Sequence, residues 1–164
     1  MPIIVYNVPS RTGVNILPKT CLELSKISNI VAIKEASGNL SQVAEIASLC
    51  GDNLTIYSGN DDQILPVLSL GGKGIISVVS NIAPKKTTKM VLDYLKGNFE
   101  DAKKSQLESI NLINALFCEV NPIPVKEALN ILGFCCGLPR LPLTPLSGEN
   151  KKTLEYEMKS YGLI

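Results

Sequence analysis

The sequence of 164 residues contains no histidine and no tryptophan, and only 5% of its residues are aromatic. The absence of histidine excludes serine and cysteine catalytic triads that use an imidazole base, and it excludes most catalytic zinc sites. Proton transfer in any reaction of this chain therefore depends on Tyr, Lys, Asp, Glu or water.

Neither sign of charge dominates the sequence. The 16 basic and 15 acidic residues leave a formal net charge of +1 and are scattered along the chain, which disfavours nucleic acid and anionic lipid as partners. No apolar run approaches the roughly 20 residues that are needed to span a bilayer, and no charged-then-apolar leader precedes the first predicted strand. We therefore expect a cytoplasmic protein, outside the membrane, that acts on small molecules.

The five cysteines form no CxxC pair and show no regular spacing, which disfavours both a zinc site and a disulfide framework. Buried, reduced thiols are the simplest expectation. The hydrophobic content of 45% lies in the globular range, and the length is sufficient for one domain with a real core. The cysteines are Cys21, Cys50, Cys118, Cys135 and Cys136.

Short β-rich runs alternate with amphipathic segments in the first part of the chain. Strands are predicted over 3–6, 30–34, 54–58 and 74–79, and helices over 18–27, 40–49 and 61–70. Pro18 suits the first turn of a helix, and Gly51 and Gly71 suit helix ends. Strands that alternate with crossover helices indicate an α/β fold with a parallel sheet of four βα units.

The character of the sequence changes after the fourth predicted strand. Every later periodic segment has helical spacing, and the proline-rich stretch 138–145 favours an extended connector. We expect two domains, a barrel-like α/β part over 1–97 and a helical region over 98–164. The later helices are predicted over 84–96, 99–117, 124–132 and 148–161.

Three side chains form a candidate site at the predicted strand ends. Lys34 ends an apolar strand, and at the mouth of a barrel such an amine can lose its proton and attack a carbonyl group, helped by burial among apolar neighbours. Tyr6 and Arg11 lie at the end of the preceding strand. The residues alone leave other interpretations open, because Lys34 could pair with Glu35, Tyr6 could pack on the rim and Arg11 could be solvated.

Two further motifs favour structural interpretations. The run Asn60-Asp61-Asp62 could bind a metal, but an Asx cap on the following helix explains it more simply. The glycines of residues 71–74 precede a predicted strand, whereas a phosphate loop follows a strand and opens a helix. We therefore assign neither motif to the site.

Five motifs occur in a fixed order: YNVPSRTG at 6–13, IKEASGN at 33–39, GGKGIISV at 71–78, NPIPVK at 121–126 and RLPLTP at 140–145. With these motifs the sequence resembles the dihydrodipicolinate synthase (4-hydroxy-tetrahydrodipicolinate synthase) family of pyruvate-dependent class I aldolases. The resemblance covers essentially all 164 residues, and the order and spacing of its motifs are specific.

The resemblance implies that the chain is the C-terminal half of a (β/α)8 TIM barrel, with the last four βα units and the C-terminal helices. In the family, the first half supplies a Gly-Thr-Thr-Gly-Glu type loop and a tyrosine that enters the neighbouring subunit's site. This sequence has no counterpart of either. We therefore expect a homo-oligomer or pairing with a separate N-terminal half, and very low activity of this chain alone.

The resemblance also implies a lyase reaction that needs no cofactor and no metal. Lys34 would form a Schiff base with pyruvate, and the derived enamine would add to L-aspartate 4-semialdehyde in lysine and diaminopimelate biosynthesis. Tyr6 would relay protons, and Arg11 would hold the carboxylate of the aldehyde substrate. Gly59 and Ile76 would line the pyruvate pocket, Gly59 by leaving space for the substrate and Ile76 through its main-chain carbonyl.

Two alternatives stay open from the sequence. N-acetylneuraminate lyase and the 2-keto-3-deoxy sugar acid aldolases share the lysine and the Tyr-Asn-x-Pro turn, although Arg11 favours a small anionic aldehyde. The chain could also be a non-catalytic assembly module, because a four-stranded half-barrel leaves two open sheet edges and an exposed inner face.

Overall fold

The structure, a computed structural model, describes residues 1–164. It divides into two compact units, Met1–Ser77 and Val78–Ile164. None of its helices has both the length and the apolar character that crossing a membrane requires.

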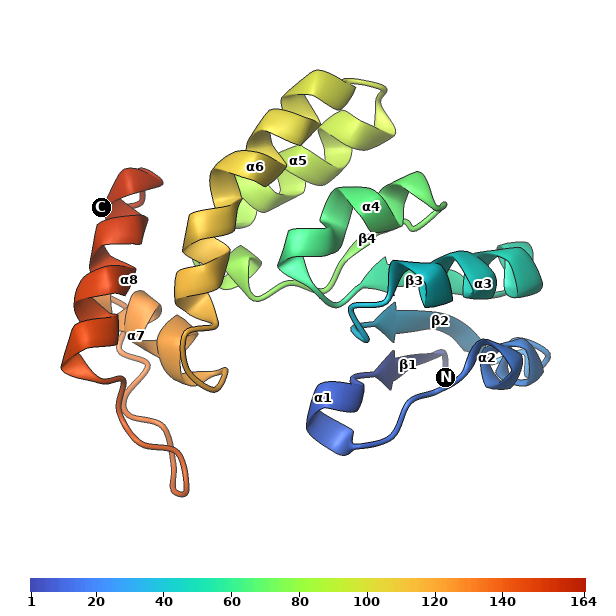
Figure 1. Ribbon diagram of the computed structural model, residues 1–164, viewed down its shortest axis with the longest axis horizontal. Coiled ribbons are helices and arrows are strands. Elements are labelled where there is room, and N and C mark those ends of the chain that lie inside the picture. The colour runs from blue at the N-terminus through green and yellow to red at the C-terminus, as the bar shows by residue number, and fades with distance from the viewer. The chain divides into compact units, whose positions relative to one another are not determined.

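The first unit is a parallel four-stranded sheet with helical connections. The strands lie in sequence order, β1-β2-β3-β4, as each βα unit adds its strand beside the previous one (Figure 1). The strands are β1 Ile3–Asn7, β2 Ile30–Glu35, β3 Thr55–Ser58 and β4 Gly74–Ile75. The connections contain α1 Pro9–Thr12, α2 Pro18–Leu24, α3 Leu40–Cys50 and α4 Ile64–Ser69, with short 3-10 helices η1 Gly51–Asn53 and η2 Asp61–Gln63.

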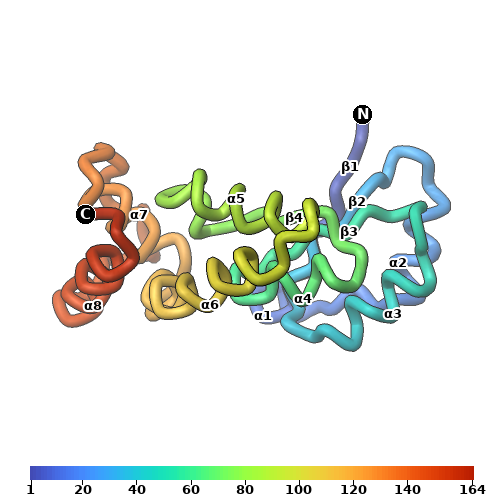
Figure 2. Tube along the Cα trace, turned by 90° about the horizontal axis from the view of Figure 1, so that it is seen from above, coloured from blue at the N-terminus to red at the C-terminus, as the bar shows by residue number.

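The core of the first unit lies between the sheet and α2, α3 and α4. Ile33 of β2 and Ile56 of β3 are buried against apolar side chains of these helices, including Val43 and Ile46 of α3. Figure 2 shows the helices along one side of the strands. Because strand side chains alternate between faces, the sheet's other face carries a different set of residues.

Local sequence signals fix the helix ends as the pattern predicted. Pro18 occupies the first turn of α2, where a missing N–H has no cost. The side chain of Asn39 accepts a hydrogen bond of 3.2 Å from the Gln42 backbone N–H and so caps α3. Gly51 ends α3 with a φ of 52°, a conformation that favours glycine.

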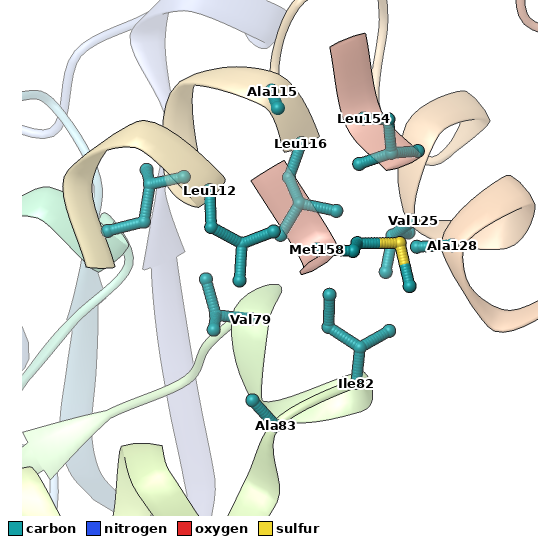
Figure 3. Close-up of a cluster of buried hydrophobic side chains, with 11 residues drawn as sticks. Val79, Ile82, Ala83, Leu112, Ala115, Leu116, Val125, Ala128, Leu154 and Met158 are labelled. Atoms are coloured by element: carbon teal, nitrogen blue, oxygen red, sulfur yellow. The ribbon is translucent and has the colours of Figure 1, made fainter. Parts of the chain in front are cut away.

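The second unit is helical. Its core is a cluster from η3 Val79–Asn81, α6, α7 and α8, in which Leu112, Leu116, Leu154 and Met158 are almost fully buried (Figure 3). Its helices are α5 Pro84–Leu95, α6 Phe99–Leu116, α7 Ile123–Ile131 and α8 Gly148–Ser160.

The first compact unit ends at Ser77, before the expected domain boundary between residues 97 and 98. The physical reason is that α5 packs directly on α6 and therefore belongs with the helices. The assignment of domains 1–97 and 98–164 stays a prediction.

Two local predictions were wrong. The fourth strand contains only Gly74 and Ile75, because the chain turns into η3 and buries Val79 in the core of the second unit. Asn60 makes no side-chain cap on η2; the nearby carboxylate of Asp61 instead accepts a hydrogen bond from the Ser77 hydroxyl.

All five cysteines are free, as expected, but the expectation that they are buried holds for only two of them. Cys21 and Cys50 are buried under the sheet, whereas Cys118 and Cys135 are exposed and Cys136 is half-buried.

Candidate active site

The predicted lysine lies in a row of side chains that crosses three strands. The parallel register pairs Tyr6 of β1 with Lys34 of β2, and Lys34 with Tyr57 of β3. Paired residues of parallel strands point to the same face, and this face is opposite to that of the buried Ile33 and Ile56. The row therefore lies on the face that α2, α3 and α4 do not cover.

The structure brings two of the predicted site residues into direct contact. The Nζ atom of Lys34 lies 4.2 Å from the centroid of the Tyr6 ring. Lys34 is half-buried, and Tyr6 is 46% exposed. An ammonium group over a phenol ring is attracted by the ring's electron-rich face, and the same phenol can donate and accept a proton. An amine and a proton-transfer group are thus adjacent at the end of two strands.

Gly59 provides the space that the lysine side chain occupies. A Cβ atom at position 59 would lie 2.6 Å from the Ala36 Cβ, 3.1 Å from the Lys34 Cε and 3.2 Å from the Glu35 carbonyl oxygen. The Gly59 N–H donates a 2.7 Å hydrogen bond to that same oxygen, which holds the two backbones close together. Only glycine fits this close approach.

Arg11 follows the end of β1. It lies in α1, a single helical turn over Pro9–Thr12 that Gly13 caps. Gly13 has a φ of 71°, and its N–H donates a 2.9 Å hydrogen bond to the Pro9 carbonyl. The Arg11 side chain is exposed.

Ile76 follows the end of β4, beside β3. Its N–H donates a 2.9 Å hydrogen bond to the Ser58 carbonyl, so one further ladder bond continues past the strand. Its side chain is 39% exposed. Arg11 and Ile76 thus follow the carboxyl ends of the first and last strands, the end at which barrel enzymes carry their sites.

Sequence reasoning missed a polar cluster beneath the row, formed by the buried residues Asn7, Glu35 and Gln42 and by the exposed Asn15 at its edge. Asn7, Glu35 and Gln42 are 1%, 3% and 6% exposed. The Glu35 carboxylate accepts hydrogen bonds from the Asn7 Nδ2 at 2.9 Å, the Gln42 Nε2 at 3.2 Å and the Ser37 N–H at 2.6 Å. The available signal was that a polar residue directly follows both Tyr6 and Lys34 at apolar strand ends.

The Cys21 thiol lies in the same core, and its pKa is raised. Burial, followed by the nearby Cys50 and Glu35, raises the pKa of the Cys21 thiol to about 11. A thiol with such a pKa, with none of its surface exposed, is unreactive at neutral pH.

The chain matches the Dihydrodipicolinate synthetase family over residues 1–161. It is 61% identical, over 163 residues, to the 4-hydroxy-tetrahydrodipicolinate synthase of Caldicellulosiruptor saccharolyticus, and the match covers 99% of this chain and 55% of that protein. The chain therefore spans about half the length of the curated relatives it matches.

Solved structures give the same result. The dihydrodipicolinate synthase of Thermotoga maritima superimposes with a TM-score of 0.97 at 42% identity, over 100% of this chain and 57% of that chain. The enzyme of Acinetobacter baumannii, solved as a chloride-inhibited complex with pyruvate, superimposes with a TM-score of 0.95 at 39% identity, over 100% and 56% of the two chains.

The parallel βα units and these likenesses confirm the predicted fold class, the C-terminal half of a (β/α)8 TIM barrel followed by helices. The match over residues 1–161 includes Tyr6, Arg11, Lys34, Gly59 and Ile76. This chain belongs to the dihydrodipicolinate synthetase family.

Proposed function

We propose that this chain carries the pyruvate-activating half of a 4-hydroxy-tetrahydrodipicolinate synthase site. The observation that carries the proposal is the contact of the Lys34 Nζ with the Tyr6 ring at 4.2 Å, at the carboxyl ends of two parallel strands. Two likenesses support it: curated relatives are named for this activity, and a solved relative binds pyruvate.

The first step is condensation of the neutral Lys34 amine with the pyruvate ketone. The new C–N bond forms as the ketone oxygen leaves as water, which requires protons to be delivered to that oxygen. The phenol of Tyr6 is the proton-transfer group that the structure holds beside this amine. Loss of a methyl proton then converts the imine to an enamine.

The second step joins the enamine carbon to the aldehyde carbon of L-aspartate 4-semialdehyde, as the aldehyde oxygen takes up a proton and the imine on Lys34 re-forms. Attack of water or of the substrate's own amine on the imine carbon then releases the Lys34 amine. Arg11 is the group we assign to the carboxylate of that substrate, because a planar guanidinium suits a planar anion and the side chain is exposed near the strand ends. A sugar acid aldolase would instead need groups for several hydroxyls. Gly59 and Ile76 line the pyruvate side of the same pocket in this proposal.

We also propose that other βα units cover the uncovered face of the sheet, from a separate N-terminal half or a second copy of the chain. The supporting observation is that apolar or aromatic side chains remain exposed on that face, with Ile4 and Tyr6 at 50% and 46%. A cytoplasmic location is part of the same proposal, which the five free cysteines support.

Exchange of the methyl protons of pyruvate tests this chemistry without the second substrate. Formation of the enamine replaces these protons by deuterium, and proton NMR in D2O follows the loss of the methyl signal. We expect the folded chain to accelerate the exchange above the buffer rate, and Lys34→Arg to abolish the acceleration.

Lys73→Arg is the matched control, because Lys73 is exposed and precedes β4, at the opposite end of the sheet. It should exchange pyruvate as the parent chain does. Exchange that survives in Lys34→Arg would contradict the assignment of the amine. A folded parent chain without any exchange would favour the assembly module over the enzyme.

A further inference from the structure

We infer that Glu35 and Asn7 are positioning residues that set the geometry of Lys34 and Tyr6 from the opposite face of the sheet. This inference rests on the proposed function, in which Lys34 and Tyr6 act together. Neither Glu35 nor Asn7 reaches the face on which pyruvate would bind.

The strand register places the two pairs one residue apart. Tyr6 pairs with Lys34, and the next pair along the same two strands is Asn7 with Glu35. Consecutive strand residues point to opposite faces, so the Asn7–Glu35 bond lies directly behind the Tyr6–Lys34 contact. Any change in the spacing or rotation of the two strand ends is shared by both pairs.

Glu35 is a buried carboxylate that hydrogen bonds rather than an ion pair hold in place. It is 3% exposed and forms no salt bridge, and both of its oxygens accept hydrogen bonds. A buried carboxylate is stable only when its oxygens accept hydrogen bonds, so the loss of any of these donors would destabilise the folded chain. The Asn7 amide is the donor that comes from the neighbouring strand, at 2.9 Å.

The cluster also fixes the segments on either side of the two strands. The Asn7 Oδ1 accepts a 2.9 Å hydrogen bond from the Ile16 N–H, and the Asn7 Nδ2 donates to the Asn15 Oδ1 at 2.9 Å. Asn15 and Gln42 exchange hydrogen bonds of 2.8 and 3.2 Å between their amides. One set of side chains therefore joins four segments: the end of β1, the segment before α2, the end of β2 and the first turn of α3.

This arrangement does more than fill the core. An apolar core of the same shape would hold the strands together without fixing the rotation of their ends, whereas directed hydrogen bonds on a carboxylate fix both distance and angle. The consequence is a defined position for the Lys34 amine over the Tyr6 ring.

A charge swap tests the inference. Asn7→Asp removes the amide that donates to Glu35 and places a second carboxylate against it, and two ionised carboxylates repel each other. The double variant Asn7→Asp/Glu35→Gln restores one carboxylate and one amide with their positions exchanged. Glu35→Gln alone keeps the size of the side chain and provides a second single variant. Glu45→Gln is the control, because Glu45 is exposed on α3.

Two measurements are made at pH 8 on each variant that thermal unfolding shows to be folded. The first is the rate of borohydride trapping of pyruvate on Lys34. The second does not depend on catalysis: lysines are labelled with ¹³C-methyl groups by reductive methylation, and NMR measures the ring-current shift that the Tyr6 ring imposes on the Lys34 methyls. Lys34→Arg and Lys86→Arg assign the signals, since Lys86 lies over the Tyr161 ring in a similar contact.

We expect Asn7→Asp to slow trapping by roughly tenfold to a hundredfold and to move the Lys34 methyl signal toward that of an unshielded lysine. The double variant should recover part of both losses, because it regains the hydrogen bond between positions 7 and 35 but not the contacts of this pair with Gln42 and Asn15. Glu45→Gln should match the parent. Parent-like values of both quantities in Asn7→Asp and Glu35→Gln would overturn the inference. If the parent chain traps no pyruvate, the proposed function fails, and the methyl shift alone still decides whether Glu35 and Asn7 position the lysine.

Discussion

The close approach of Gly59 to Lys34 gives the sharpest mutational prediction. In Gly59→Ala, the new methyl group would lie 2.6 Å from the Ala36 Cβ and 3.1 Å from the Lys34 Cε, whereas ordinary contacts begin at 3.4 Å. The Gly59 N–H bond to the Glu35 carbonyl holds the two strand ends together, so they cannot separate without loss of that bond. Ordinary contact requires the Ala36 Cβ to move by about 0.8 Å and the Lys34 Cε by about 0.3 Å, so the larger adjustment falls on the backbone just after the end of β2.

The magnitude follows from two terms. Overpacking of this kind costs about 1–3 kcal/mol of unfolding free energy. A displacement of about 1 Å of a reacting group can slow a reaction by about a hundredfold. The shift required at Lys34 is a few tenths of an ångström, so we expect Gly59→Ala to unfold at lower urea concentration and to trap pyruvate on Lys34 more slowly than the parent chain, by up to about tenfold.

Gly148→Ala is the matched control. A Cβ at position 148 meets nothing within 4 Å, and the residue begins α8. Alanine there should leave the trapping rate unchanged and should affect stability by less than about 1 kcal/mol. Equal stability and equal trapping rates in Gly59→Ala and the parent would refute the argument that glycine makes space for the lysine.

Four further predictions follow from the same structure. Tyr6→Phe keeps the ring under the amine but removes the phenol, so trapping of pyruvate should slow by at least about tenfold, as read by intact mass over time. Arg11→Ala should leave that trapping rate within about twofold of the parent's, because we assign Arg11 to the second substrate only. The Cys21 thiol has a pKa raised from 9.0 to about 11, so the folded state binds the thiol proton more tightly than the unfolded state does, and the unfolding free energy should fall as pH rises from about 9 to about 11. Cys21→Ala should make this slope shallower in urea titrations without removing it, because the pKa values of Cys50 and Tyr161 are also raised. An unchanged slope would contradict the cause. Leu154→Ala deletes a side chain with no exposed surface and should cost about 2–5 kcal/mol, whereas Leu107→Ala, at a residue that is 65% exposed, should cost less than about 1 kcal/mol by the same unfolding assay.

The sequence predicted the parts of the fold that depend on local signals. Pro18 and Gly51 stand where their backbone preferences allow a helix to begin or end, and the structure confirms those positions. Alternation along β2 likewise places Lys34 and the buried Ile33 on opposite faces of the sheet, because backbone geometry alone makes consecutive strand residues point in opposite directions.

The sequence did not predict features that depend on pairing between distant segments. Asn7 and Glu35 are 28 residues apart, and their bond exists only because the parallel register places them side by side. The short β4 has a similar cause, since Val79 contributes to a core that its own local sequence does not reveal. Asn60 fits the cap pattern, yet its side chain forms no cap on η2.

The reactive groups of the candidate site could be predicted from the sequence, but the residues that position them could not. Lys34 and Tyr6 were identified from strand-end positions, and the structure places them in contact. Gly59 entered only through the family resemblance, and its physical reason, the distance to the Lys34 side chain, required the structure. The roles of all these residues stay predictions until the chemistry is measured.

The central claim is that Lys34 is the amine that condenses with pyruvate. The most direct test is to incubate the folded chain with pyruvate, reduce with borohydride, digest, and locate the adduct by peptide mass spectrometry, with Lys34→Ala treated in parallel. The account predicts a single reduced pyruvyl group on the peptide that contains Lys34 and none in Lys34→Ala. An adduct spread over several of the exposed lysines, or one that persists in Lys34→Ala, would contradict it.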